Sequence, residues 1–287
     1  MDFDALLLRQ EGMFGTWQLR HAGWSEAKAR HAVRRLREIH HGVHATGHAG
    51  LTPRQRCWAA VLTEPGTRLS HASLARLAGF DDWEFDHETV TRLGNGGRVH
   101  HPGLVVYRSA RLASIEIGEI HGIPSVRPAR ALLDLLPQRT ERNAARLVRN
   151  ALRSGAVTEK DLRVMLALHP GRRGITRLRR YTDAYGHLPL HRTKSDAEAL
   201  GLAVLDALGI EIPLVNVKIM GEEADYVWRE HRWIVELDSR RWHHPVEDAR
   251  KTAVWEGARW TVRRVATDDV YDRPDRLLAA LPPGLRR

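Results

Sequence analysis

Three carboxylates stand among large apolar residues in the segment EADYVWREHRWIVELDSRRWHH, which covers residues 223–244. Asp225, Glu236 and Asp238 are interspersed with Tyr, Val, Trp, Ile and Leu, a composition typical of partly buried strands. A buried carboxylate destabilises a fold unless a cation, a proton or hydrogen-bond donors compensate its charge. These residue types therefore indicate that the acids have a partner.

The two apolar runs predict a β-hairpin that turns at residues 229–232. In that register Asp225 lies opposite Glu236, and Asp238 lies on the same face, because side chains alternate between the faces of a strand. Directly opposed residues have Cβ atoms roughly 4.5–5.5 Å apart. Two carboxylates at that spacing repel each other unless a cation or a proton lies between them. A slip by one residue would move Asp225 to the other face.

A hard divalent cation fits this pair, since Mg²⁺ (or Mn²⁺) takes oxygen ligands and can also accept a phosphate oxygen. The stretch RRWHH follows the acidic strand. There His243 has an ordinary pKa near neutrality and can act as a base towards water, and Arg241 can bind phosphate. The alternative reading is a surface loop with ordinary imidazoles and with the acids in salt bridges.

The last third of the chain has an order of elements that would position these side chains. It predicts helix, three strands, helix, strand and helix, at 195–208, 214–219, 223–228, 232–238, 246–257, 259–265 and 268–280. The preceding residues, LPLHRTK at 188–194, indicate a linker. The fold class expected for the whole chain is α/β (α+β overall).

The first 50 residues predict three short helices and a small β-ribbon. The segment GMFG is expected to be a turn, and the third helix, from Ser25 to about Arg37, carries Arg30, Arg34 and Arg35. The glycines of HHGVHATG punctuate the ribbon. Short helix, tight turn, basic third helix and ribbon make a winged helix-turn-helix pattern, which binds DNA. The alternative is a three-helix piece with a solvated basic face.

The chain has a formal net charge of +10, and its pI is about 10.4, which favours a polyanionic partner such as nucleic acid. Arginine abundance alone is weak support, because a GC-rich genome also produces it. The arginine-rich stretch GRRGITRLRR is either a phosphate-contacting surface or a solvated helix face. The single cysteine, Cys57, excludes an internal disulfide and is expected to be a core residue.

No apolar run approaches 18 residues and the N-terminus has no signal-peptide core, so we expect no membrane contact and a cytoplasmic location. The middle region, from residue 51, predicts helices, then short strands over 88–120, then helices at 140–153 and 158–168. We therefore expect three domains, a winged helix-turn-helix, an α/β middle region and an αβββαβ domain, at 1–50, 51–187 and 190–287.

The blocks SDAEALGLAVLDALG, IPLVNVKIMGEEADYVW, WIVELDSRRWHH and EGARWTVRRV together resemble the very-short-patch-repair (Vsr)-like branch of the PD-(D/E)xK nuclease superfamily. The resemblance implies a restriction-endonuclease-like fold with Asp225 and Glu236 as ligands of Mg²⁺ or Mn²⁺. It implies that His243 is the base and that Glu198 faces the site, although Ser195 and Glu198 also form a capping box. Asp238, a further catalytic candidate, stands where many relatives of the superfamily carry Lys, and Asp is usual there in this branch.

Three positions depart from that family: Ser239 replaces a Gly, and Ala249 and Thr252 replace an Arg and an Asp in the helix that carries Lys251. Lys251, with Arg241, is expected to hold the scissile phosphate. If the replaced residues brace the site, activity is weakened.

The segments GTWQLRHAGWSEAKARHAVRRLREIHHGVHATG, LSHASLARLAGF and GIPSVRPARALLDLL resemble AbiEi-type antitoxins. That likeness implies binding of double-stranded DNA through the winged helix and a toxin protein as a possible partner.

Three functions follow from these readings. The first is a metal-dependent DNA endonuclease. The second is an antitoxin-type transcriptional regulator with an inactive nuclease module. The third is a DNA-binding scaffold without catalysis. The oligomeric state, the DNA sequence and the existence of a toxin are left open.

Overall fold

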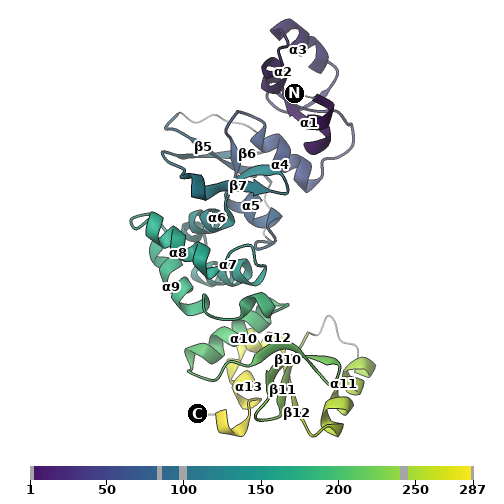
Figure 1. Cartoon of the computed structure of the whole chain (residues 1–287), viewed down its shortest axis with the longest axis vertical. Helices are drawn as coiled ribbons and strands as arrows, with labels where there is room; N and C mark the ends of the chain where they lie inside the picture. Colours follow the sequence, from purple (N-terminus) through teal and green to yellow (C-terminus); the bar gives the residue numbers. More distant parts are fainter. Residues whose placement is uncertain (1–2, 83–85, 97–101, 240–244, 286–287) are drawn as a thin grey trace. The chain divides into compact units, whose positions relative to one another are not determined.

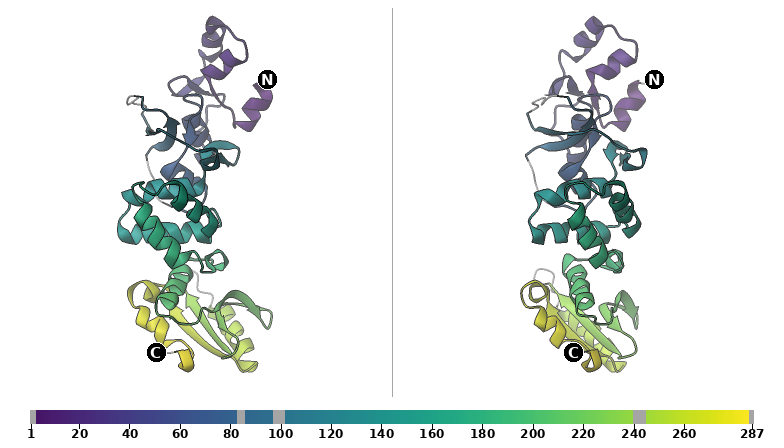
Figure 2. Two further views of the ribbon diagram at one scale, coloured as in Figure 1. Left: turned by 60° about the vertical axis from the view of Figure 1, so that its left-hand side comes forward. Right: turned by 90° about the vertical axis from the view of Figure 1, so that its left-hand side faces the viewer.

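The computed structural model describes residues 3–82, 86–96, 102–239 and 245–285, and it confirms the mixed α/β class (Figures 1 and 2). The chain divides into two compact units. Unit 1 comprises Met1–Arg139 and Ala167–Ile175, and unit 2 comprises Thr140–Leu166 and Thr176–Arg287. The three-domain division stays a prediction. Most of the helical part of the expected middle domain, from Thr140 onward, belongs to unit 2 together with the C-terminal region.

Unit 1 begins with six short elements in the order helix, strand, helix, helix, strand, strand. They are α1 (Phe3–Arg9), β1 (Met13–Gly15), α2 (Thr16–His21), α3 (Glu26–Val33), β2 (Arg37–His40) and β3 (Val43–Ala45). The strands form an antiparallel sheet of order β1-β3-β2. The predicted ribbon is therefore confirmed.

Two local predictions in this region are wrong. The expected turn at GMFG is instead β1, because Met13 and Phe14 are buried and the strand pairs with β3. The third helix ends at Val33 rather than near Arg37. The chain must be extended from Arg37 onward, because β2 pairs with β3 across a turn at Gly42, whose φ is +74°.

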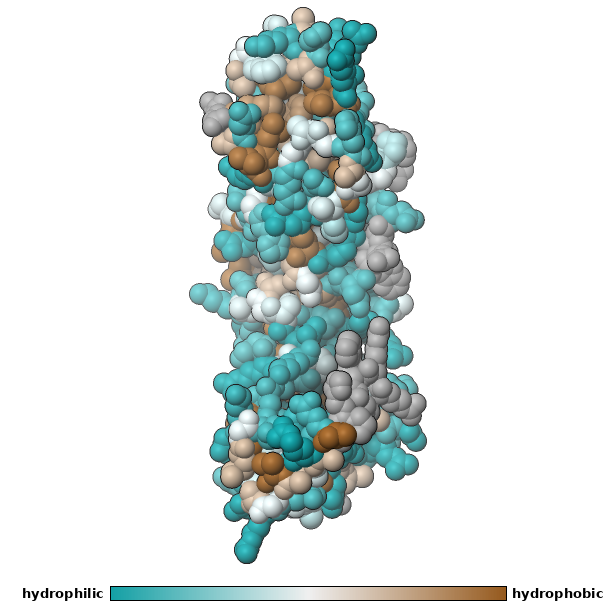
Figure 3. All heavy atoms as spheres, turned by 90° about the vertical axis from the view of Figure 1, so that its right-hand side faces the viewer, coloured by the Kyte–Doolittle hydropathy of each residue, from teal (hydrophilic) through white to brown (hydrophobic). Residues whose placement is uncertain are grey.

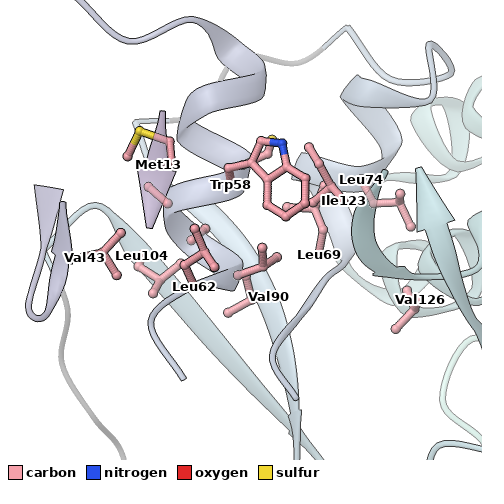
Figure 4. Close-up of a cluster of buried hydrophobic side chains, with 14 of the residues drawn as sticks. Met13, Val43, Trp58, Leu62, Leu69, Leu74, Val90, Leu104, Ile123 and Val126 are labelled. Carbon is pink, nitrogen blue, oxygen red and sulfur yellow. The ribbon is translucent and has the colours of Figure 1, made fainter. Parts of the chain in front are cut away.

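A five-stranded sheet with order β6-β5-β4-β8-β7, three α-helices and two short 3-10 helices follow among the described residues of the first part of the chain. The elements are α4 (Pro53–Val61), β4 (Arg68–Leu69), α5 (His71–Leu77), β5 (Glu88–Leu93), β6 (Leu104–Ser109), η1 (Ser114–Glu116), β7 (Ile117–Ile120), β8 (Ile123–Val126), α6 (Pro128–Leu135) and η2 (Leu136–Gln138). The main apolar cluster joins Trp58 of α4 to Val90 and Ile123 of the sheet (Figure 4).

Cys57 of α4 belongs to that cluster and is 1% exposed, as expected for a core residue. Burial, reinforced by the negative charge of Glu88, raises the pKa of the Cys57 thiol to about 12. The reactive species towards disulfide reagents is the thiolate. We therefore expect no labelling by Ellman's reagent at pH 8 in the native protein, and one equivalent in guanidinium chloride. Rapid stoichiometric labelling of the native protein would contradict this burial.

Unit 1 also encloses a cluster of charges that the sequence did not indicate. Arg130 of α6 is 1% exposed, and its guanidinium binds the carboxylates of Glu116 and Asp134. His169 bonds to Glu116 at 2.7 Å, and Arg172 bonds to Asp134 at 2.9 Å. The positive and negative charges are therefore paired inside the unit.

Unit 2 contains the remaining helices and a four-stranded sheet of order β12-β11-β10-β9, in which only β11 and β12 are parallel. Its elements are α7 (Glu141–Arg153), α8 (Glu159–Leu168), α9 (Ile175–Tyr185), η3 (Leu190–Arg192), α10 (Asp196–Ala207), β9 (Leu214–Ile219), β10 (Glu222–Trp228), β11 (Trp233–Asp238), α11 (Pro245–Gly257), β12 (Thr261–Ala266), α12 (Thr267–Asp272), α13 (Pro274–Ala279) and η4 (Pro283–Leu285). The predicted helix, three strands, helix and strand are confirmed.

Helices cover both faces of this sheet. Trp255 of α11 packs with Val227 and Ile234 on one face. On the opposite face Tyr226 donates a hydrogen bond to the α10 backbone, and the Trp233 indole donates to a carbonyl just after α13. The sheet is thus fixed by aromatic residues whose polar atoms are bonded.

The final helix is broken, contrary to the single helix expected at 268–280. It divides into α12 and α13 at Arg273, because the following Pro274 disfavours helical backbone at the residue before it. Within the described ranges, no helix has the length and apolar character needed to cross a membrane.

Candidate functional site

The hairpin of β10 and β11 has the predicted register. Val227 pairs with Ile234 and Trp228 pairs with Trp233, across a turn at 229–232. The same register places Asp225 opposite Glu236, where the carboxylates replace backbone carbonyls as acceptors. The amide of Asp225 donates to Glu236 Oε1 at 3.0 Å.

The second half of this exchange runs from β11 to β10. The amide of Leu237 donates to Asp225 Oδ2 at 2.8 Å. Each carboxylate is therefore held by an amide of the neighbouring strand, and no other described residue forms a hydrogen bond with its second oxygen. Among the described residues neither Asp225 nor Glu236 has an ion pair within 4.0 Å.

The surroundings of this pair favour the neutral acids. Burial, followed by the negative charge of Glu236, raises the pKa of Asp225 from 3.8 to about 8. Burial also raises the pKa of Glu236, although the bond from the Asp225 amide opposes the shift. Two buried carboxylates that share one region cannot both ionise without additional positive charge.

Lys251 of α11 supplies part of that charge. It is half-buried, and its positive charge lowers the pKa of both Asp225 and Glu236. Lys251 was expected to bind phosphate. In the structure it lies close enough to Asp225 and Glu236 to interact electrostatically with both. The helix thus contributes a cation to the strand pair.

Asp238 lies at the end of β11 and has a different partner. Its carboxylate accepts a hydrogen bond of 2.8 Å from Arg264 of β12. The same guanidinium donates to Thr252 Oγ1 and to the backbone carbonyl of Asp248, so it links β11, β12 and α11. Arg264 was missed by the sequence reasoning, although its strand was expected.

Glu198, at the start of α10, is 6% exposed and has two structural roles. Its amide is capped by the Ser195 hydroxyl, which also donates to the Glu198 carboxylate, so the expected capping interaction is present. The negative charge of Glu198 also raises the pKa of Asp225. Helix capping and proximity to the candidate site are therefore combined in one side chain.

Asn216 of β9 bonds to Glu198 of α10 and holds its carboxylate in place. Its amide nitrogen donates to Glu198 Oε2 at 2.6 Å and to the carbonyl of Arg192 at 2.9 Å. The residue has a φ of +49°, in the left-handed region that Asn tolerates better than most residues. Asn216 is thus a positioning residue. It lies in the block IPLVNVKIMGEEADYVW, but the sequence pattern indicated no role for it.

Replacing Asn216 separates the contribution of its side-chain hydrogen bonds from the cost of its positive φ. We expect Asn216→Ala to lower the free energy of unfolding of unit 2 by about 1–3 kcal/mol, because it removes two hydrogen bonds and retains a strained φ. Asn216→Gly loses the same bonds without the strain and should be more stable than the alanine variant by about 1 kcal/mol. Urea unfolding measures both values. Equal stability of the two variants would contradict the strain argument.

His243 and Arg241, the expected base and phosphate ligand, lie outside the described residues. The DNA-binding candidates Arg30, Arg34 and Arg35 are exposed in unit 1, with Arg30 in an i,i+4 ion pair with Glu26. Only Arg30 lies within α3, since Arg34 and Arg35 follow its last residue.

The arginine-rich stretch at 171–180 proves to be partly structural. Arg172 is bound to Asp134, and Arg177 and Arg180 pair with Glu141. These pairings favour the solvated-face interpretation for the three arginines.

The donor set around Asp225 and Glu236 fits a divalent cation. Among the described residues each carboxylate has one oxygen beyond its amide bond, burial raises both pKa values, and oxygen ligands are those that Mg²⁺ prefers. In the described ranges no group of three or more His, Cys, Asp and Glu side chains is arranged as a metal site. Asp225 and Glu236 would therefore supply only part of the ligands of such a cation.

No protein-family model matches the chain, and no curated protein is significantly similar to it.

Proposed function

We propose that the protein binds double-stranded DNA and hydrolyses its phosphodiester bonds with Mg²⁺ or Mn²⁺ held by Asp225 and Glu236. The observation that carries this proposal is the buried carboxylate pair, locked by reciprocal strand amides and short of positive charge. Such a pair destabilises the fold unless a cation binds it, which is expected of a functional site rather than of a structural ion pair.

The chain's own residues have distinct tasks in this reaction. Asp225 and Glu236 would hold the cation, which when bound would compensate the negative charge that develops on the phosphate. Lys251 attracts and orients the phosphate from α11. His243 accepts a proton from the attacking water through its imidazole. The negative charge of Glu198 raises the pKa of Asp225 and so favours its protonated form when no cation is bound.

The fold of unit 2 supports the assignment of the domain. A central hairpin, a crossover helix and a parallel fourth strand place the acids of β10 and β11 beside α11. This is the αβββαβ arrangement expected from the resemblance to Vsr-like nucleases. The domain is therefore proposed as restriction-endonuclease-like.

The N-terminal elements support DNA binding. The region contains helix, strand, two helices and two strands, with sheet order β1-β3-β2, and α3 follows the turn after α2. This order supports the proposal of a winged helix-turn-helix. Lys28 of α3, like Arg30 and the arginines that follow, is exposed. These side chains are proposed to contact phosphates in and beside the major groove.

The salt dependence of DNA binding tests this surface. The triple variant Arg30→Gln/Arg34→Gln/Arg35→Gln should bind duplex DNA more weakly, and its log K against log[salt] slope should be shallower by about one unit per lost phosphate contact. Fluorescence anisotropy measures the slope. Arg127→Gln, another exposed arginine of unit 1, serves as the matched control. An unchanged slope in the triple variant would remove α3 from the interface.

A second function is favoured by one specific observation. Thr252, which replaces an Asp of the Vsr-like pattern, accepts a hydrogen bond from Arg264 and so has a structural partner instead of a catalytic one. A DNA-binding regulator of the antitoxin type, with an inactive nuclease module and a toxin partner, would tolerate this replacement.

A cleavage assay separates the two functions. The full chain is incubated with plasmid, matched duplex and mismatched duplex, in Mg²⁺, in Mn²⁺ and in EDTA. We expect cuts in the metal samples only. DNA that is retarded on a gel but never cut in either metal would favour the regulator.

A further inference from the structure

A cavity of about 460 Å³ lies in unit 1, where α1 and α2 meet α4 and the start of the five-stranded sheet. Its volume is in the range of pockets that enclose small ligands. Apolar side chains gather over the N-terminal elements at the upper end of the molecule in Figure 3. The residues that matter for the cavity's chemistry are Arg9, Trp17, Trp58, Leu62, Glu64 and Arg68. None of them belongs to the carboxylate site.

The apolar part of the wall is aromatic and ordered. Trp58 is 3% exposed and Leu62 is 4% exposed. The Trp17 indole donates a hydrogen bond of 2.7 Å to the carbonyl of Leu62, which ties α2 to the end of α4. The Trp58 indole N–H has no hydrogen-bond partner among the described residues. Two indole rings, one with an unsatisfied buried donor, suit a flat ligand that carries an acceptor.

The charged part of the wall is positive on balance. Arg9 and Arg68 have neither an ion pair nor a side-chain hydrogen bond with the described residues. Of the two acidic residues in the wall, Glu64 is paired with Arg92, and Glu119 on β7 is exposed, as Arg9 is, so two guanidiniums face one carboxylate that has no ion pair among the described residues. Two unpaired guanidiniums beside aromatic rings are suited to a carboxylate on an apolar body.

We propose that this cavity binds a small aromatic carboxylate, with its rings against Trp17 and Trp58 and its anionic group at Arg9 and Arg68. The ligand would contact α1 and α2 as well as α4 and the sheet, so it would strengthen the packing of the N-terminal helices on the rest of unit 1. This site is independent of the proposed nuclease function, because no residue is shared.

Calorimetric titration of the full chain tests the proposal. The probes are benzoate and 2-naphthoate, with benzamide and 2-naphthamide as neutral counterparts of the same shape. We expect one molecule of carboxylate to bind per chain, at least about tenfold more tightly than its amide, because a charge-assisted bond to Arg is lost in the amide. Ligand binding should also raise the unfolding temperature.

Single variants locate the binding site. Arg9→Gln and Arg68→Gln should each weaken 2-naphthoate binding about tenfold, and Arg127→Gln should leave it unchanged, since Arg127 does not line the cavity. Arg9 is exposed, so its replacement leaves the packing intact and keeps the test valid if Arg68→Gln destabilises the unit.

Three outcomes would overturn the proposal. They are the absence of binding by both carboxylates at millimolar concentration, equal binding of carboxylates and amides, and equal affinity of wild type and Arg9→Gln.

Discussion

Asp225→Asn should stabilise the metal-free protein while removing the proposed metal-dependent cleavage. Asn keeps an oxygen that accepts from the Leu237 amide, but it carries no charge. At pH 8 and without metal, we expect the unfolding temperature of unit 2 to rise by at least about 5 °C, because a buried, poorly compensated carboxylate is gone. Cleavage should fall on the order of 10³-fold, since the metal's charge stabilisation is lost.

The pH dependence of this gain has a definite sign. The folded-state pKa of Asp225, about 8, is above its usual value of 3.8, so the folded chain keeps a proton that the unfolded chain loses near pH 4. Ionisation of Asp225 therefore lowers the free energy of unfolding progressively as the pH rises from about 4 to 8. The stability gain of Asp225→Asn should be absent at pH 4 and largest at pH 8 and above.

Asp238→Asn is the matched control on the same strand. It also removes one negative charge, but that charge is paired with Arg264. We therefore expect it to leave stability unchanged or to lower it. Differential scanning calorimetry at pH 5 and pH 8, with EDTA, compares the three proteins. A loss of stability in Asp225→Asn at pH 8 would contradict the account of the carboxylate pair.

Arg130→Met should lower the free energy of unfolding of unit 1 by about 3–5 kcal/mol, which is the usual effect of breaking a buried ion pair from one side. Arg130 is fully enclosed, and its removal leaves Glu116 and Asp134 as buried carboxylates without their main cation. Burial alone would raise the pKa of Glu116, but the Ala113 amide and Arg130 outweigh it and hold that pKa low. Without Arg130 that balance is lost.

Two further variants identify the cause of this loss. Adding Glu116→Gln and Asp134→Asn to Arg130→Met should recover part of the stability, because the uncompensated charges are then absent. Arg127→Met, at an exposed position of the same unit, should change the free energy by less than about 0.5 kcal/mol. Urea unfolding monitored by circular dichroism gives these values. Equal stability of Arg127→Met and Arg130→Met would show that the cluster contributes nothing.

The sequence predicted unit 2 well because local patterns and pairing agree there. Alternating apolar residues and the turn at 229–232 specify one register, and Trp228 pairs with Trp233 only in that register. The sequence therefore predicted that Asp225 and Glu236 lie opposite each other. The third helix of unit 1 was predicted too long, because its last residues favour helix locally while β2 pairing requires an extended chain.

Long-range polar contacts were beyond the reach of the sequence. Arg264 and Asp238 meet only through the parallel pairing of β11 with β12, and Asn216 of β9 bonds to Glu198 of helix α10, 18 residues away in the sequence. The sequence around Arg130 does not distinguish it from an exposed arginine on a helix. Its burial depends on segments that pack around it in three dimensions, and no local pattern encodes that environment.

Titration of the full chain with Mn²⁺ at pH 8 tests the central claim most directly, because it measures cation binding at Asp225 and Glu236 without requiring the correct DNA substrate. We expect saturable binding with release of protons, since the metal displaces the proton that the pair retains. Binding should be abolished in the Asp225→Asn/Glu236→Gln variant and retained in Asp238→Asn. Mn²⁺ binding of equal strength in wild type and the double variant, or no binding by the wild type, would contradict the claim.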